Sequence, residues 1–110
     1  MIKLVYFISE SGTNNIKIGY TKDDISVRIQ SLQTGNPRKL TLIGIIYKGT
    51  MKLEKELHSR WKNYKIKDNS EWFILKKDSD LLKYLNEISE YYIDIDDINK
   101  SLLIYNKMKN

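Results

Sequence analysis

The hydrophobic positions of the first fifty residues favour extended chain in three places. Residues 2–8 are rich in β-branched and aromatic side chains, residues 16–20 alternate apolar and polar positions, and residues 40–47 form a third apolar run. Such runs are typical of strands. Because the turn-forming residues Gly12 and Asn14 separate the first two runs, we predict that these two strands pair as an antiparallel hairpin.

Between the second and third strands the apolar spacing becomes helical. Asp23 or Asp24 can cap a helix that runs to about Thr34, and Gly35 follows where helices commonly end. Apolar residues recur on one face of this segment: Ile25, Ile29 and Leu32. This spacing predicts an amphipathic helix that packs on the sheet.

The second half of the chain is predicted to be mostly helical. One helix begins at a Thr50 cap and runs to about Tyr64, with Leu53, Leu57 and Trp61 on its buried face. Residues 71–75 follow as a short extended segment that packs back on the body. A further helix over residues 78–91 is predicted to bury four apolar side chains, those of Leu81, Leu82, Leu85 and Ile88.

These elements predict an α+β fold, in which a small antiparallel three-stranded sheet is flanked by helices. Residues 1–86 form the predicted domain, and residues 87–110 form a mostly helical C-terminal extension whose last helix covers about residues 93–107. A chain of 110 residues is long enough for one hydrophobic core.

Composition narrows the class of protein. The absence of cysteine excludes disulfides and thiolate metal sites. No apolar run approaches the ~20 residues that cross a bilayer, and the N-terminal residues lack the pattern of a secretory leader. We therefore expect a cytoplasmic protein, or one in the host-cell interior if it is viral, with no membrane partner.

The net charge of +5 is unevenly distributed. Residues 1–77 hold 15 Lys and Arg against 7 Asp and Glu, whereas residues 78–110 hold 4 against 7. A basic body suits a polyanionic partner, although a charge excess of this size also serves solubility alone.

Six short motifs follow one another along the chain. In order they are Val5-Tyr6, Lys17-Ile18-Gly19, Arg28, Gln33-Thr34-Gly35, Glu54-x-x-Leu57-His58 and Glu71-Trp72-Phe73. The ordered set resembles the GIY-YIG nuclease superfamily, and within it the branch named for T5orf172 and for a meiotically up-regulated gene, number 113. The resemblance covers about residues 4–86 and implies a small GIY-YIG-type domain. Leu4 replaces the glycine of the wider superfamily's first motif, and Lys17 replaces the first tyrosine of its second.

The resemblance implies hydrolysis of DNA phosphodiester bonds with one divalent ion, Mg²⁺ or Mn²⁺, bound by Glu54. A lone carboxylate suits Mg²⁺, which keeps most of its waters. By the same resemblance Tyr6 accepts the proton of the attacking water or holds that water in line. An ordinary phenol has a pKa of about 10, so this role requires positive charge nearby, which Lys17 is expected to supply. Arg28 is expected to donate to the scissile phosphate, and Tyr20 occupies a position where relatives often carry another active-site residue.

Side chains around the predicted cleft are expected to contact DNA, namely Lys22, Arg38, Lys39, His58, Arg60 and Lys62. His58 lies four residues after Glu54, on the same helical face, and is expected to contact a phosphate or to support the metal ligand. Because the chain has one histidine, we do not expect a zinc site.

Each candidate also has an ordinary structural interpretation. Tyr6 in an apolar strand is most simply a core aromatic, and the aromatic residues Trp61, Trp72 and Phe73 are expected in the core rather than as stacking platforms. Three functions therefore remain open: a metal-dependent DNA endonuclease, a non-catalytic or weakly catalytic DNA-binding module of viral or phage type, and a protein-interaction role for the acidic C-terminal segment. The endonuclease requires Tyr6, Lys17, Arg28 and Glu54 to converge on one cleft.

Overall fold

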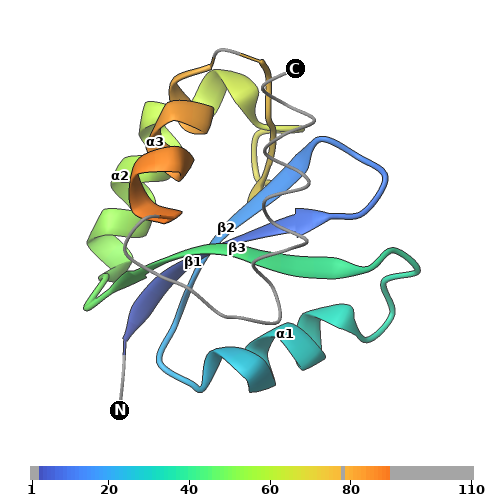
Figure 1. Cartoon of the computed structure of the whole chain (residues 1–110). Helices are drawn as coiled ribbons and strands as arrows, with labels where there is room; N and C mark the ends of the chain where they lie inside the picture. Colours follow the sequence, from blue (N-terminus) through green and yellow to red (C-terminus); the bar gives the residue numbers. More distant parts are fainter. Residues whose placement is uncertain (1–2, 78, 90–110) are drawn as a thin grey trace.

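A computed structural model describes residues 3–77 and 79–89 of the chain and places a four-stranded antiparallel sheet between two helical layers (Figure 1). The strands are β1 (Leu4–Glu10), β2 (Asn15–Thr21), β3 (Leu40–Tyr47) and β4 (Trp72–Ile74), and their order in the sheet is β3-β1-β2-β4. The helices are α1 (Ile25–Gln33), α2 (Met51–Arg60), the short 3₁₀ helix η1 (Lys62–Tyr64) and α3 (Asp80–Ser89). The predicted α+β class is confirmed.

The predicted three-stranded sheet is wrong by one strand. Residues 72–74, predicted only as an extended segment, form β4 and pair antiparallel with β2, with Lys17 opposite Trp72. A bridge from Lys65 to Phe73 continues this pairing outward. The strand is three residues long and its partner lies more than fifty residues away in the sequence. Local alternation cannot specify a pairing of that kind, because register depends on which faces become buried.

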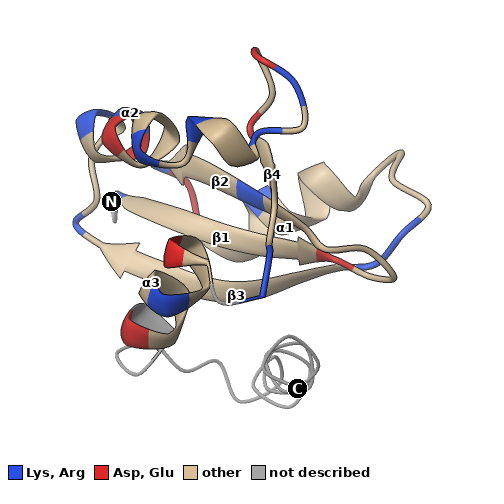
Figure 2. Ribbon diagram, turned by 90° about the horizontal axis from the view of Figure 1, so that it is seen from above, with Lys and Arg blue, Asp and Glu red and all other residues tan. Residues whose placement is uncertain are grey.

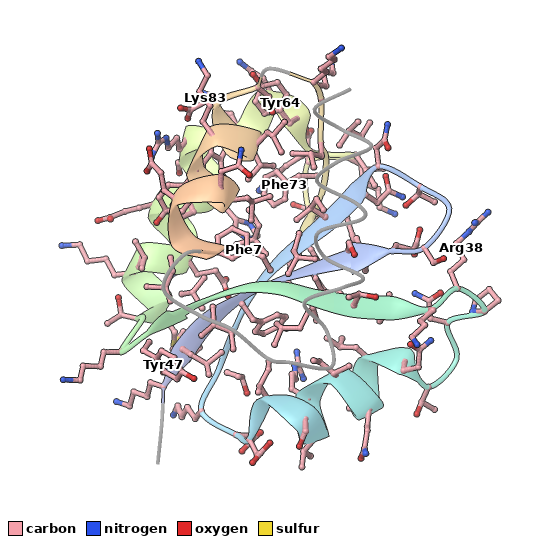
Figure 3. All side chains as sticks on the ribbon, viewed as in Figure 1. Phe7, Arg38, Tyr47, Tyr64, Phe73 and Lys83 are labelled. Atoms are coloured by element: carbon pink, nitrogen blue, oxygen red, sulfur yellow. The ribbon has the colours of Figure 1, made fainter. Side chains whose placement is uncertain are left out.

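The sheet is apolar on both faces, and each face belongs to a separate cluster. On one side, Tyr6 and Ile8 of β1 pack with the inner face of α1, which consists of Ile25, Ile29 and Leu32 as predicted. On the other side, Phe7 and Ile18 pack with residues of α2, β4 and α3 (Figure 3). Because neighbouring residues of a strand point to opposite faces, every second residue of β1 and β2 faces α1.

The predicted starts of α1 and α2 are confirmed, whereas α3 begins later than predicted, at Asp80, and α2 ends earlier than predicted. The Asp24 side chain accepts from the Ser26 N–H (2.8 Å), and the Thr50 hydroxyl accepts from the Leu53 N–H (3.0 Å). Helix α2 ends at Arg60 rather than near Tyr64, because the backbone leaves helical geometry at Trp61 and tightens into η1. The buried face of α2 is as predicted, with Leu57 and Trp61 enclosed and Leu53 packed against them.

The Gln33-Thr34-Gly35 motif joins α1 to β3. The Gln33 amide nitrogen donates to the carbonyls of Asn36 (3.2 Å) and Arg38 (2.8 Å), and its oxygen accepts from the Leu40 N–H (2.9 Å). Gly35 has a φ of +81°, a conformation that glycine adopts without strain. This motif therefore has a structural role, in that it fixes where β3 begins.

Helix α3 confirms the predicted burial of Leu81, Leu82 and Leu85. Residue 2 of the first predicted strand, residues 78, 90 and 91 of the predicted third helix, and the side chain of Ile88 lie outside what the structure describes. The predicted helix at residues 93–107 lies outside it as well, so the division at residues 86 and 87 stays a prediction. Within the described residues, no helix is both long enough and apolar enough to cross a membrane.

Replacing Leu85 by Ala tests whether α3 is part of the core. Leu85 is fully buried between α3 and the sheet, so the Leu85→Ala variant should lose about 2–5 kcal/mol of unfolding free energy, through lost burial and the cavity left behind. Urea unfolding measures this loss. The control is Ile66→Ala, at a side chain that is 46% exposed, and its cost should stay within about 0.5 kcal/mol. Equal, small effects for both variants would contradict the packing described for α3.

Candidate active site at the edge of strand β2

The candidate site lies at the outer edge of β2, where the pairing with β4 ends. Both backbone groups of Ile18 face outward from the β1–β2 pair. Its N–H donates to the carbonyl oxygen of Glu71 (3.1 Å), and its carbonyl accepts from Nε2 of His58 (2.9 Å). A carbonyl only accepts, so Nε2 of His58 carries a proton. The edge of β2 thereby fixes two candidate residues from distant segments of the chain.

Tyr6 and Arg28 meet on the α1 face of the sheet. The Tyr6 side chain is fully buried, and its hydroxyl accepts a hydrogen bond from Nε of Arg28 (3.3 Å). Gly19 lies opposite Tyr6 across the strand pair. A Cβ at that position would lie 2.3 Å from Cζ and from the hydroxyl oxygen of Tyr6. The glycine of the Lys-Ile-Gly motif is therefore what allows the Tyr6 ring to lie against β2.

The cation that is hydrogen-bonded to Tyr6 differs from the one that the sequence predicted. Lys17 was expected to supply the positive charge near the phenol, but the group bonded to it is the Arg28 guanidinium. The hydrogen bond to Tyr6 raises the pKa of Arg28, with smaller contributions from the charges of Tyr6, Glu71 and Asp23. Arg28 is thus held firmly in its charged form.

Lys17 is buried on the face of β2 that is turned toward α1, as Gly19 is, and it forms an ion pair with Glu71. Only 6% of the Lys17 residue is exposed, and its ammonium lies 5.9 Å from the centre of the Trp72 ring. Trp72 is half-buried and packs against the α1-side cluster, while Phe73 is fully buried on the other face. The expected core placement of Trp61 and Phe73 is confirmed, and that of Trp72 holds in part.

Glu54 approaches from the other side, on α2. Partial burial raises the pKa of Glu54 above its ordinary value of 4.5, and the neighbouring charge of Glu71 adds to the increase. His58, one turn further along α2, and Lys17 act in the opposite direction. His58 itself is half-buried and lies edge-on to the Phe73 ring, with 5.0 Å between ring centres. Glu54 therefore lies within electrostatic range of both members of the Lys17–Glu71 pair.

Glu71 interacts with three of the four predicted residues. It pairs with Lys17, and its charge acts on both Arg28 and Glu54. Sequence reasoning gave Glu71 no role, although it stands in the Glu-Trp-Phe motif that supported the family resemblance. The structure identifies Glu71 as part of the site because Trp72, the next residue, pairs with Lys17, and the sequence does not reveal this pairing.

Several predicted site residues lie elsewhere. Tyr20 points to the opposite face of β2 from Lys17 and packs against the cluster under α2 and α3. Arg38 donates to the Ser11 carbonyl (3.1 Å) beyond the far end of the sheet, and Figure 3 shows it extending outward. Lys39 neighbours Arg38 and is exposed, and Lys62 is exposed on η1.

Arg60 is exposed, but its guanidinium is held by a residue of α3. Its Nε and one terminal nitrogen donate to the two carboxylate oxygens of Asp80, at 2.7 and 3.0 Å. The guanidinium lies over the rings of Trp61 and Tyr84, and the Trp61 indole also donates to Asp80 (2.8 Å). These contacts lower the pKa of Asp80 through its hydrogen bonds from Arg60 and Trp61. They fasten α2 to α3.

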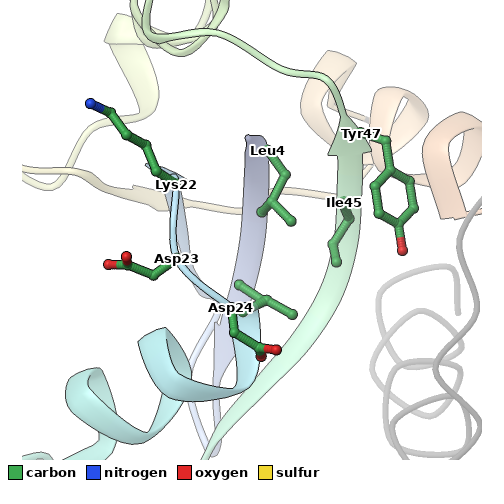
Figure 4. A pocket seen from close by; sticks show the side chains of 7 residues that line it. Leu4, Lys22, Asp23, Asp24, Ile45 and Tyr47 are labelled. Carbon is green, nitrogen blue, oxygen red and sulfur yellow. The ribbon is translucent and has the colours of Figure 1, made fainter. Parts of the chain in front are cut away.

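A pocket of about 420 Å³ lies at the N-terminus of α1, near the ends of β1 and β3 (Figure 4). Lys22, a predicted DNA contact, is one of its lining residues, but its side chain extends away from Leu4, Ile45 and Tyr47. Tyr6, Lys17, Arg28 and Glu54 do not line this pocket. This pocket is therefore separate from the Tyr6–Arg28 and Lys17–Glu71 contacts.

The donor set at the edge fits a hydrated divalent ion better than a fully enclosed metal. No group of three His, Cys, Asp or Glu side chains suited to a metal occurs in the described part of the chain. Glu54 offers a partly desolvated carboxylate with a second carboxylate, Glu71, nearby. Such a carboxylate suits Mg²⁺, which takes one or two protein oxygens and completes its shell with water and phosphate.

Comparison with known proteins identifies the family of the chain. The family model described as the T5orf172 domain matches residues 3–91. The chain therefore belongs to the T5orf172 domain family. No curated protein and no solved structure matches the chain.

The raised pKa of Glu54 predicts how a Glu54→Gln variant responds to pH. A carboxyl whose pKa is raised by folding binds its proton more tightly in the folded state, so its contribution to stability is present in acid and is lost as the pH rises through that pKa. The stability of the wild type relative to Glu54→Gln should therefore be greatest below about pH 4 and should decrease toward pH 7. Thermal unfolding of both proteins across this range measures it. A difference between the two proteins that does not change with pH would contradict the burial of Glu54.

Proposed function

We propose that the protein is a divalent-metal-dependent DNA endonuclease of the GIY-YIG type. The observation that supports this most strongly is that Arg28 donates to the Tyr6 hydroxyl and that Lys17 pairs with Glu71, whose charge acts on both Arg28 and Glu54. Family membership supports it independently, since the T5orf172 domain resembles GIY-YIG nucleases.

Each side chain has a chemical role in this proposal. Arg28 binds the scissile phosphate. Its Nε holds Tyr6, and the two terminal nitrogens of the guanidinium remain in a geometry that suits two non-bridging oxygens. The same guanidinium holds the Tyr6 hydroxyl, and in this proposal that hydroxyl takes the proton of the attacking water or holds the water in line.

Glu54 is the proposed metal ligand, and Mg²⁺ or Mn²⁺ is the proposed ion. The bound ion would supply stabilisation of the charge that develops on the phosphate, and a water of lowered pKa. His58 keeps α2 against the β2 edge through its bond to Ile18, which holds Glu54 in reach of the Lys17–Glu71 pair.

A cleavage assay tests the proposal. The wild type should nick supercoiled DNA with Mg²⁺ or Mn²⁺, while Glu54→Ala and Tyr6→Phe should each lose about 10²-fold or more in rate, because each removes a group that acts only on the transition state. The control is Glu56→Ala, which changes an exposed glutamate of the same helix and should cleave like the wild type. If the wild type and Glu54→Ala retain DNA equally and neither cleaves it with either metal, the enzyme proposal is wrong.

The runner-up is a DNA-binding module with little or no cleavage. One observation favours it: the Tyr6 hydroxyl is fully enclosed and already bonded to Arg28, so a substrate must displace neighbouring groups before water reaches the phenol. Figure 2 shows Lys and Arg positions on α2 and on the segment between η1 and β4, which projects from the body beside the site. Both proposals use the Lys and Arg side chains of α2, η1 and this segment to bind DNA.

If these side chains bind DNA, replacing Lys62 and replacing its neighbour Arg60 should have different effects on DNA binding. Lys62→Ala should weaken binding and reduce the slope of log affinity against log salt by about 1, as expected for one lost phosphate contact. Arg60→Ala should leave that slope unchanged and lower the melting temperature instead, because Arg60 is held by Asp80. Fluorescence anisotropy over a salt series, with a melting curve for each variant, measures both effects. A smaller slope in Arg60→Ala would mean that Arg60 leaves Asp80 to bind DNA.

A further inference from the structure

Lys17 is a buried charge with one carboxylate partner. Only 6% of Lys17 is exposed, whereas the Glu71 side chain that pairs with it is 46% exposed. A buried ammonium without a carboxylate is strongly unfavourable. The placement of the Lys17 ammonium therefore depends on Glu71 much more than Glu71 depends on Lys17.

The backbone of Glu71 is fixed beside the strand that carries Lys17. Its carbonyl accepts from the Ile18 N–H (3.1 Å), and the next residue, Trp72, pairs in register with Lys17. The Trp72 ring also lies near the Lys17 ammonium, at 5.9 Å. The Glu71 carboxylate therefore starts from a rigid position and reaches Lys17 without a flexible loop between them.

The charge of the Glu71 carboxylate also acts on both parts of the proposed site. It acts on Arg28, which holds Tyr6 on the α1 face, and on Glu54, which lies on α2. An ordinary surface ion pair would contribute little, but this pair determines where a buried cation lies beside the pairing of β2 with β4.

We infer that Glu71 is a positioning residue of the active site: it holds the Lys17 ammonium at the edge of the sheet, where β2 pairs with β4. The catalytic consequence rests on the proposed nuclease function, whereas the contact itself does not. Glu71 acts through Lys17, so loss of Glu71 should misplace the Lys17 ammonium and reduce turnover more than substrate binding.

The contact can be tested without any activity. Nitrogen-15 spectra of lysine NH₃⁺ groups detect ammonium protons that an ion pair protects from rapid exchange with water, and Lys17→Gln assigns the Lys17 resonance. The resonance should be present in the wild type and in Asp68→Asn, which removes an exposed carboxylate three residues before Glu71, and absent in Glu71→Gln. A Lys17 resonance that is unchanged in Glu71→Gln would overturn the inference.

The catalytic consequence is tested by a double-mutant cycle. Glu71→Gln should lower kcat by about 10- to 100-fold, as expected for a small displacement of an active-site group, with KM changed less than about twofold. In the Lys17→Gln background the same substitution should cause no further loss. Glu71→Asp, which keeps the charge on a shorter stem, should recover part of kcat.

The outcomes separate the two proposals. Independent, multiplicative losses in the cycle, or a change in KM alone, would show that Glu71 does not act through Lys17. Absence of cleavage by the wild type would overturn the nuclease, while the NH₃⁺ spectra would still decide whether Glu71 holds Lys17. If Glu71→Gln fails to fold, Glu71→Asp and the wild-type resonance carry the same test, because a wild type without a protected Lys17 ammonium contradicts the inference.

Discussion

The arrangement of this protein depends on how the outer edge of β2 is completed at Ile18. Both backbone groups of Ile18 point away from β1, and buried backbone groups need partners. Strand β4 is too short to supply both. The Glu71 carbonyl accepts from the Ile18 N–H. The His58 side chain donates to the Ile18 carbonyl, where a further strand residue would otherwise donate. These two hydrogen bonds place the start of β4 and the middle of α2 beside Ile18. Glu54 lies near His58 because the two are one helical turn apart.

A sheet edge is a place where groups on the two faces can approach each other. Tyr6 and Lys17 point toward α1, whereas α2 covers the opposite face. Strands keep these faces apart by their alternation, and an apolar cluster covers each face. Glu71 lies just before β4, beyond the paired part of β2, and its charge acts on residues from both sides.

Holding these groups together has an energetic cost that the apolar clusters offset. Lys17 and the Tyr6 hydroxyl are buried, and Glu54 is partly desolvated next to another carboxylate. Each arrangement is less favourable than an apolar side chain of similar volume would be. The Arg60–Asp80 contact joins α2 to α3.

The sequence by itself determined the elements and the candidate residues. Caps at Asp24 and Thr50, the inner faces of α1 and α2, and the long strands follow from local spacing, because side-chain periodicity and capping act within a few residues. The ordered motifs likewise pointed to Tyr6, Lys17, Arg28 and Glu54 before their positions were known. Only the tertiary structure decided the fourth strand, the bond from Arg28 to Tyr6 and the pairing of Glu71 with Lys17. The bond from Arg28 to Tyr6 depends on how α1 packs on β1. The fourth strand and the pairing of Glu71 depend on the register between β2 and β4, which is set by which surfaces are buried together rather than by any pattern along the chain.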